Sequence, residues 1–262
     1  MRDFFITERL KKHFGDNPET AFEKIFHLEG EDYRLVKARR TIRFELEGRG
    51  YFAKVHRCIG WKEIFKDLFQ FKLPILGAGN EYAALELLKE KNVPTMSCAA
   101  FGRRGWDPAR QQSFLVTDEL ANMVSLEDFV KTPEFPALRR RIFDFLAGSL
   151  GKMHACGLNH RDCYICHYLL DPAEAVNGNI KLFVIDLHRA QIRKTVPFRY
   201  RVKDVAGILF SSFDLAPTKR ELMRFRAIYS RFNPEVKADR RFWSAVDNAA
   251  RKLYKKEFGR EI

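Results

Sequence analysis

The chain has 262 residues, enough to bury a sizeable core in one or two domains. Lysine and arginine outnumber aspartate and glutamate by 47 to 34, which gives a formal net charge of +13 and favours an anionic partner such as a nucleotide, a nucleic acid, an acidic lipid or a phosphorylated glycan. The sequence shows no apolar stretch of roughly 18 residues, no signal-peptide core and no cysteine framework, which argues against a membrane-spanning or secreted disulfide-bonded protein. We therefore expect a cytoplasmic protein without structural disulfides.

Three short strands are predicted near the start of the chain, after an uninformative aromatic stretch over residues 1–30. They cover 33–37, 41–46 and 51–55, and their alternation and intervening turns are typical of an antiparallel meander. Lys54 lies in the third strand. A lone lysine in a strand is usually a solvated edge residue. In protein kinases, however, the corresponding strand carries the lysine that contacts the nucleotide phosphates.

An amphipathic helix is predicted over 61–73. Its lysines and acidic residues gather on one face. The other face either packs on the strands or forms a lid or a surface that touches lipid. The apolar face consists of Trp61, Ile64, Phe65, Leu68 and Phe69.

The next helix is predicted from Asn80, a good capping residue, to about residue 91. In a protein kinase, the corresponding helix supplies the acid that pairs with the strand lysine. We expect Glu81 to be the partner of Lys54, with Glu86 as the alternative. Both glutamates also fit a solvent-facing helix surface.

Two further strands, over 98–101 and 113–117, flank a basic loop and lead to a predicted hinge at 118–122. Backbone groups of Glu119 and Leu120 in this hinge are candidates for hydrogen bonds to an adenine edge. A capping pattern opens a helix at residue 125, and a longer helix is predicted to begin near residue 136 and to end at residue 157.

The run His-Arg-Asp-Cys-Tyr-Ile-Cys-His occupies 160–167, and an apolar strand further on ends at Asp186. Phosphoryl transfer needs one carboxylate near the acceptor hydroxyl and another to hold the magnesium that bridges the nucleotide phosphates. Asp162 and Asp186 fit these two roles, and the segment between them has room for a short β-hairpin. Three helices are predicted to follow, over 201–213, 218–231 and 240–258, the first carrying Asp204.

These residues resemble the lipopolysaccharide core heptose kinases, in particular the heptose I kinases, over nearly the whole chain. The resemblance rests on the octapeptide at 160–167, on Ile-Asp-Leu-His at 185–188, on Lys54 and on Lys203-Asp204 before an apolar helix. It implies a two-lobed α+β protein-kinase-like fold. An antiparallel β-sheet lobe with one main helix would span 1–121 and bind the nucleotide phosphates. A helical lobe with the catalytic and metal-binding loops would span 122–262.

The resemblance also implies an activity: phosphorylation of the inner-core heptose of lipopolysaccharide, with ATP and Mg²⁺. Asp162 would be the catalytic base, Asp186 the magnesium ligand and Lys54 the phosphate contact. The acceptor would be the lipid-linked core glycan. The basic charge agrees with a peripheral visit to the anionic inner leaflet of the inner membrane.

Several positions depart from the protein-kinase pattern. Lys-Ala-Arg-Arg at 37–40 replaces the glycine-rich loop, so side-chain charge would have to hold the phosphates there. His167 stands where a protein kinase offers an asparagine to its second metal, and is either a weak metal ligand or a brace for the loop. His188 replaces the glycine of Asp-Phe-Gly, and no Ala-Pro-Glu follows, so a phosphorylated activation segment is not expected.

Cys163 and Cys166 invite a zinc or redox interpretation, but no second cysteine pair with suitable spacing exists, so we expect two small side chains in a tight loop. Other functions are a kinase for another small molecule or a protein, and an inactive kinase-fold scaffold. Retention of Lys54 with both aspartates argues against the scaffold. A nucleic-acid binder is disfavoured because the arginines are dispersed without a zinc-finger or RNA-binding signature.

Overall fold

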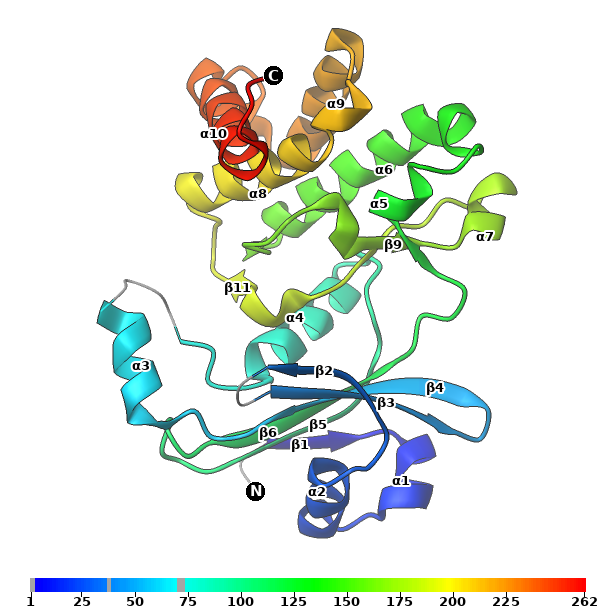
Figure 1. Ribbon diagram of the computed structural model, residues 1–262, viewed down its shortest axis with the longest axis vertical. Coiled ribbons are helices and arrows are strands. Elements are labelled where there is room, and N and C mark those ends of the chain that lie inside the picture. The colour runs from blue at the N-terminus through cyan, green and yellow to red at the C-terminus, as the bar shows by residue number, and fades with distance from the viewer. Residues whose placement is uncertain (1–2, 37–38, 70–73) are drawn as a thin grey trace. The chain divides into compact units, whose positions relative to one another are not determined.

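The computed structural model describes residues 3–36, 39–69 and 74–262. By internal contacts the chain separates into two compact units. The first comprises Met1–Glu86 with Met96–Ala121, and the second comprises Leu87–Thr95 with Asn122–Ile262. Figure 1 traces both.

The described part of the first unit is built on a six-stranded sheet in the order β1-β5-β6-β4-β3-β2, in which each neighbouring pair is antiparallel. The three predicted strands near the start correspond to β2, β3 and β4. In chain order the elements are β1 (Asp3–Ile6), α1 (Glu8–Phe14), α2 (Pro18–Phe26), β2 (Glu31–Val36), β3 (Arg39–Leu46), β4 (Arg49–His56), α3 (Gly60–Phe69), α4 (Gly79–Glu90), β5 (Cys98–Arg104) and β6 (Gln112–Asp118).

One face of the sheet carries the core of this unit, together with α1 and α2. Along β4, the side chains of Tyr51, Ala53 and Val55 are buried in this core, as the two-residue period of a strand requires. Lys54 therefore points to the opposite face. Phe22 of α2 is fully buried and its ring centroid lies 5.1 Å from that of Phe114. Phe14, Phe22 and Phe26 near the start of the chain thus belong to this core, whereas Phe5 is exposed.

Helix α3 confirms the predicted amphipathic helix but leaves most of its apolar face in contact with solvent. Only Ile64 is buried, whereas Trp61 and Phe65 are half exposed and Phe69 is 83% exposed. The rings of Trp61 and Phe65 stack at a centroid distance of 5.6 Å. The end predicted over 70–73 lies outside the described residues, as do Lys37 and Ala38.

The second unit is mostly helical (Figure 1). Its β9 and β10 form the short hairpin predicted between the two key aspartates, with α7 in the connection. In chain order the elements are β7 (Val124–Ser125), α5 (Leu126–Phe129), α6 (Phe135–Ala155), β8 (Leu158–Asn159), η1 (Ile165–His167), β9 (Tyr168–Leu170), α7 (Pro172–Val176), β10 (Phe183–Val184), η2 (Leu187–Arg189), β11 (Gln191–Ile192), α8 (Phe198–Ser211), η3 (Phe213–Leu215), α9 (Lys219–Phe232), η4 (Pro234–Val236) and α10 (Arg240–Phe258).

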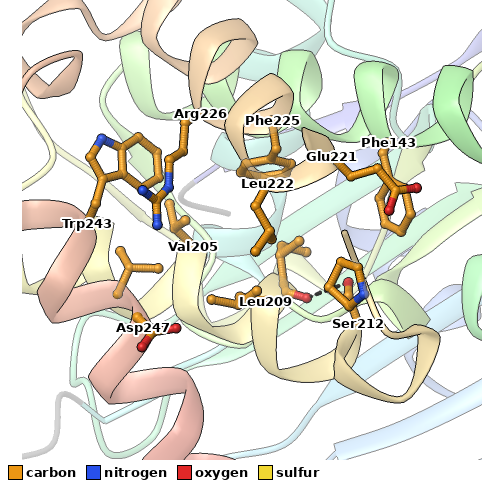
Figure 2. A pocket seen from close by; sticks show the side chains of 13 residues that line it. Phe143, Val205, Leu209, Ser212, Glu221, Leu222, Phe225, Arg226, Trp243 and Asp247 are labelled. Atoms are coloured by element: carbon orange, nitrogen blue, oxygen red, sulfur yellow. Dashed lines mark hydrogen bonds between the residues drawn. The ribbon is translucent and has the colours of Figure 1, made fainter. Parts of the chain in front are cut away.

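Four helices of this unit, α6, α8, α9 and α10, surround a pocket (Figure 2). Leu209 of α8, Phe225 of α9 and Trp243 of α10 contribute apolar lining, and Glu221 and Arg226 bring charged groups to it. No helix in the described part of the chain has both the length and the apolarity needed to cross a membrane.

Candidate active site

Lys54 and Glu81 form the ion pair expected from the sequence. Lys54 Nζ on β4 lies 2.5 Å from Glu81 Oε1 on α4. The side chains are only 15% and 1% exposed, so water screens their attraction less than at the surface. Glu81 Oε2 is buried without a hydrogen-bond partner in the described structure. Glu86, the alternative partner, is exposed.

The predicted hinge follows β6 in the first unit. The backbone N–H of Glu119 donates to the Gly50 carbonyl at 2.9 Å, and its carboxylate accepts two hydrogen bonds from Arg43 at 2.9 and 2.8 Å. A Cβ on Gly50 would lie 1.6 Å from Glu119 Oε2, so glycine makes this arrangement possible. Because the Glu119 amide is already used, its carbonyl is the backbone group that remains for an adenine. Leu120 is the next residue of this segment and is half-buried.

The catalytic loop of the second unit is held by Asp204, which lies on α8 and is fully buried. Its Oδ2 accepts the backbone N–H of His160 at 2.6 Å, and its Oδ1 accepts that of Arg161 at 2.8 Å. His154 of α6 places Nε2 3.3 Å from the same carboxylate and hydrogen-bonds the Tyr229 hydroxyl through Nδ1 at 2.6 Å. Charge-assisted hydrogen bonds of this kind are among the strongest in proteins, so Asp204 fixes the backbone just before Asp162.

The backbone near the two aspartates has unusual conformations and close contacts. Arg161 and Asp186 have positive φ angles of 76° and 59°, which cost non-glycine residues on the order of 1–2 kcal/mol each. Gly207 lets α8 approach the loop closely, because a Cβ there would lie 2.3 Å from the carbonyl oxygen of Cys163. The segment that carries Asp162 is therefore tightly restrained by α8.

Asp162 faces two cations. Arg189 Nη1 lies 2.9 and 3.1 Å from its carboxylate oxygens, and Lys203 Nζ lies 3.8 Å from Oδ1. The Asp162 side chain is only 19% exposed. Two cations thus hold the carboxylate that is predicted to be the base.

His167 links the two aspartates of this unit. Its Nδ1–H donates to the backbone carbonyl of Asp162 at 2.7 Å, and its Nε2 lies 3.7 Å from Asp186 Oδ2. Burial of the ring opposes protonation, but hydrogen bonds with the Cys166 sulfur and the Asp162 carbonyl outweigh it and raise the pKa of His167 to about 9. The bracing contact is therefore present, and Nε2 faces the carboxylate predicted to bind metal.

His160 stacks on His167, with ring centroids 5.5 Å apart and planes at 6°. Burial lowers the pKa of His160, so its neutral ring donates Nε2–H to the Ile185 carbonyl at 2.9 Å. This hydrogen bond ties the catalytic loop to the residue before Asp186.

The Asp186 carboxylate also has a neighbour that replaces the kinase glycine. His188 Nδ1 lies 2.5 Å from Asp186 Oδ1. Within residues 3–36, 39–69 and 74–262, no three side chains of His, Cys, Asp or Glu are grouped as a metal-binding set. Asp186 and His167 remain the predicted metal ligands.

The cysteines of the loop differ in their surroundings. Cys163 is buried beside Tyr168, its Sγ 3.6 Å from the tyrosine hydroxyl, and burial raises the pKa of its thiol well above the usual value. Cys166 is half-buried, next to His167. All five cysteines are free thiols.

Sequence reasoning assigned no role around the predicted base to three residues, although it quoted Lys203 and Asp204 as part of the resemblance. Arg189 and Lys203 reach Asp162 from η2 and α8, and Asp204 holds the loop backbone. The signal for Asp204 was present, since an acidic residue in an apolar helix needs buried partners. No spacing rule marks Arg189 among the many arginines of this chain.

Comparisons with known proteins match most of the chain. The sequence profile of the lipopolysaccharide kinase (Kdo/WaaP) family matches residues 23–229. The chain is 46% identical over 248 residues to lipopolysaccharide core heptose(I) kinase WaaP of Pseudomonas aeruginosa, covering 92% of each chain. It is 42% identical over 213 residues to the enzyme of that name from Escherichia coli, covering 79% of this chain and 80% of the relative.

A solved structure described as WaaP in complex with acyl carrier protein superposes with a TM-score of 0.78 at 39% identity, covering 96% of this chain and 99% of the other. The predicted resemblance and the predicted protein-kinase-like α+β fold are thereby confirmed. The chain belongs to the lipopolysaccharide kinase (Kdo/WaaP) family.

Proposed function

We propose that this protein is an ATP-dependent kinase that phosphorylates heptose I in the inner core of lipopolysaccharide. The observation that carries the proposal is the pair of heptose(I) kinase relatives at 46% and 42% identity, which match most of the chain. The loop carrying Asp162, held by Asp204, supplies the matching chemistry. The comparisons give no support to a protein-directed kinase or to an inactive scaffold.

Asp162 is the proposed base. As the acceptor oxygen attacks the γ-phosphorus of ATP, the hydroxyl proton passes to the Asp162 carboxylate and the bond to ADP breaks. Arg189 and Lys203, at 2.9 and 3.8 Å, orient this carboxylate before the acceptor arrives.

Lys54 is the proposed contact for the nucleotide phosphates, and Glu81 holds its amine in place. The carbonyl of Glu119 and the backbone of Leu120 would bind the adenine edge. With these roles, residues 1–121 form the nucleotide-binding lobe and residues 122–262 the catalytic lobe.

The residues around Asp186 fit a magnesium ion, because a carboxylate oxygen is the donor that this hard cation prefers. When bound, magnesium neutralises charge on the phosphate oxygens and aligns them for transfer. Asp186 would be the main ligand. His167 offers Nε2 on the same side, although an imidazole nitrogen suits softer ions better. The 2.5 Å contact from His188 orients the carboxylate.

Labelled ATP tests the proposal. The protein is incubated with lipopolysaccharide lacking core phosphate, and in parallel with a mixture of soluble proteins. Label should enter the glycolipid in the first reaction and remain in the nucleotide in the second. Labelling of proteins, or of neither acceptor, would overturn the proposal.

We also propose that the enzyme is cytoplasmic and visits the anionic inner leaflet of the inner membrane, where a lipid-linked acceptor would be found. The exposed apolar face of α3 supports this interpretation. Trp61, Phe65 and Phe69 face solvent, and lysines flank them, which is the composition of an interfacial helix. The net charge of +13 adds attraction to acidic lipid.

Acyl carrier protein is a second proposed partner. The solved WaaP structure, 39% identical to this chain, contains it. Calorimetric titration with purified acyl carrier protein, with and without its acyl group, tests the association. Saturable binding is expected, and absence of heat with both forms would contradict it.

A further inference from the structure

An unbalanced group of cations surrounds Asp162 in the second unit. Arg189 and Lys203 pair with its carboxylate at 2.9 and 3.8 Å. Arg161, the residue before it, makes no side-chain hydrogen bond or ion pair with any residue that the structure describes. Two cations thus share the Asp162 carboxylate, and Arg161 adds a third cation next to it in the chain without a carboxylate of its own in the described structure.

The other nearby carboxylate cannot balance them. Asp204 is fully buried, and both of its oxygens accept backbone N–H groups of the loop. Its charge is therefore committed to holding the loop, and the group made by Arg161, Asp162, Arg189 and Lys203 carries an excess of two positive charges.

These cations are held in an unfavourable setting. Burial lowers the pKa of Arg161, and the charge of Arg189 lowers it further. Burial also lowers the pKa of Lys203, although Asp162 counteracts this effect. Partly buried like charges repel one another and lose hydration. A site of this kind gains most when an anion arrives.

The positive surface continues along the chain at Arg193 and Arg199. Their guanidinium carbons lie 4.6 and 4.4 Å from the ring centroid of Tyr200. Arg193 also donates to Asn159 Oδ1 at 2.6 Å. These contacts hold both guanidiniums on one flat ring and leave no carboxylate among their partners in the described structure.

We infer that Arg161, Arg189 and Lys203 form an acceptor subsite that binds an anionic group, a carboxylate or a phosphate, on the glycan close to the hydroxyl that is phosphorylated. The inference rests on the proposed function. Guanidinium groups bind such oxyanions in a bidentate manner. When the anion accepts a hydrogen bond from Arg189 in place of Asp162, the Asp162 carboxylate becomes available to the hydroxyl. Binding of the acceptor thus makes the base available.

Two glycan treatments distinguish the sources of the anion. Lipid-free core glycan without phosphate at the target position is prepared intact, with its carboxylates reduced to alcohols, or with its remaining phosphates removed. Binding is measured by calorimetry without nucleotide, and turnover is measured with ATP. The KM for the glycan and the KM for ATP are determined separately.

Arg161→Gln is the main variant, with Arg161→Lys as the conservative replacement. Lys203→Gln gives a second route if Arg161→Gln does not fold. Arg140→Gln is the matched control, because Arg140 is an exposed cation on α6 outside the site. Thermal unfolding checks that each variant is folded.

Arg161→Gln should raise both the dissociation constant and the KM for intact glycan by about tenfold, the usual effect of one lost charge-assisted contact. KM for ATP should stay within about twofold of the wild type, and Arg161→Lys should recover part of the loss. The glycan stripped of the relevant anion should bind wild-type protein as weakly as intact glycan binds Arg161→Gln. That glycan should show no further loss with the variant.

Equal binding and KM for all three glycans in the wild type would overturn the inference, and so would a rise confined to the KM for ATP, which would assign the cations to the nucleotide. The first result leaves the proposed function intact. Absence of turnover with every glycan would instead overturn the proposed function, while charge-dependent binding in the calorimeter would still support an anion subsite.

Discussion

The two aspartates of the second unit sit in contrasting surroundings. Asp162 lies among cations, with Arg189 at 2.9 Å. Asp186 lies among imidazoles, with His188 at 2.5 Å and His167 at 3.7 Å. Ion pairs fix the orientation of the Asp162 carboxylate, whereas two histidine rings orient the Asp186 carboxylate. The surroundings agree with the separate roles proposed for the two residues.

Replacing Asp162 by asparagine removes the proton acceptor while keeping its size. Turnover should fall by about 10² or more, as for other positioned bases. ATP affinity should remain near the wild-type value. Steady-state kinetics and equilibrium nucleotide binding check this expectation. A variant with wild-type turnover would show that another group takes the proton.

Variants of His167 can distinguish its two possible roles, which are bracing the loop and binding metal. If Nε2 binds the metal, His167→Asn should raise activity with magnesium relative to manganese, because an amide oxygen suits the harder ion. His167→Ala should cost much less activity than Asp186→Ala in either metal. Turnover of the three variants in both metals gives the answer. An unchanged magnesium-to-manganese ratio in His167→Asn would favour the hydrogen bond to the Asp162 carbonyl as the main role of this histidine.

Helix α8 meets the catalytic loop at Gly207. Alanine normally stabilises a helix by about 1 kcal/mol relative to glycine, but here its Cβ would lie 2.3 Å from the carbonyl oxygen of Cys163. Gly207→Ala should therefore lower both the melting temperature and the turnover. The matched control is Gly148→Ala on α6, where the nearest atom to the new Cβ is 3.9 Å away and a rise in stability is expected. Equal behaviour of the two variants in thermal unfolding would contradict the steric explanation.

Helix α3 offers a test of the membrane proposal. Phe65 and Phe69 are 50% and 83% exposed, so replacing both with serine should leave stability within about 0.5 kcal/mol. Binding to vesicles should weaken by roughly tenfold, because two aromatic side chains no longer enter the interface. Phe145→Ser, at a 45% exposed site on α6, is the control. Loss of folding without measurable vesicle binding in the parent protein would mean that α3 serves the fold alone.

Sequence patterns succeeded where an element is long and its period is clear. The helices α4, α6 and α10 were predicted close to their observed bounds because apolar residues recur at helical spacing. The elements within the first 26 residues were not predicted, because they show no clear period. β1 has only four residues and α1 only seven, too few for a period to show. The Asn17-Pro18 start of α2 was a signal that went unused, since Asn17 Oδ1 accepts the Glu19 amide at 3.0 Å.

The site was predictable to the extent that its residues lie in recognisable local runs. Lys54 and Glu81 were paired from the order of strand and helix, and the structure contains that ion pair. The contacts of Arg189 and Lys203 with Asp162 were not predicted, because they depend on how η2 and α8 pack. That packing is set by contacts far apart in the sequence.

At the scale of the whole molecule, the net charge of +13 should make membrane association depend on salt. The Debye length falls from ~8 Å at 0.15 M to ~3 Å at 1 M ionic strength, so attraction to acidic lipid weakens. Sedimentation with vesicles that contain anionic lipid should show affinity decreasing steadily with added sodium chloride. Zwitterionic vesicles should bind weakly at any salt concentration. If binding to both kinds of vesicle is independent of salt, the association depends on apolar contacts and not on charge.

The hold of Asp204 on the catalytic loop has a consequence for biosynthesis. The carboxylate lies 44 residues after His160 and 43 after Arg161, the residues whose amides it accepts. At about 5–20 residues per second, a ribosome needs a few seconds to make that interval. Until Asp204 emerges and α8 packs, nothing compensates for the positive φ of Arg161. A nascent or prematurely terminated chain that stops before Asp204 therefore carries the aspartate of the catalytic loop without its geometry.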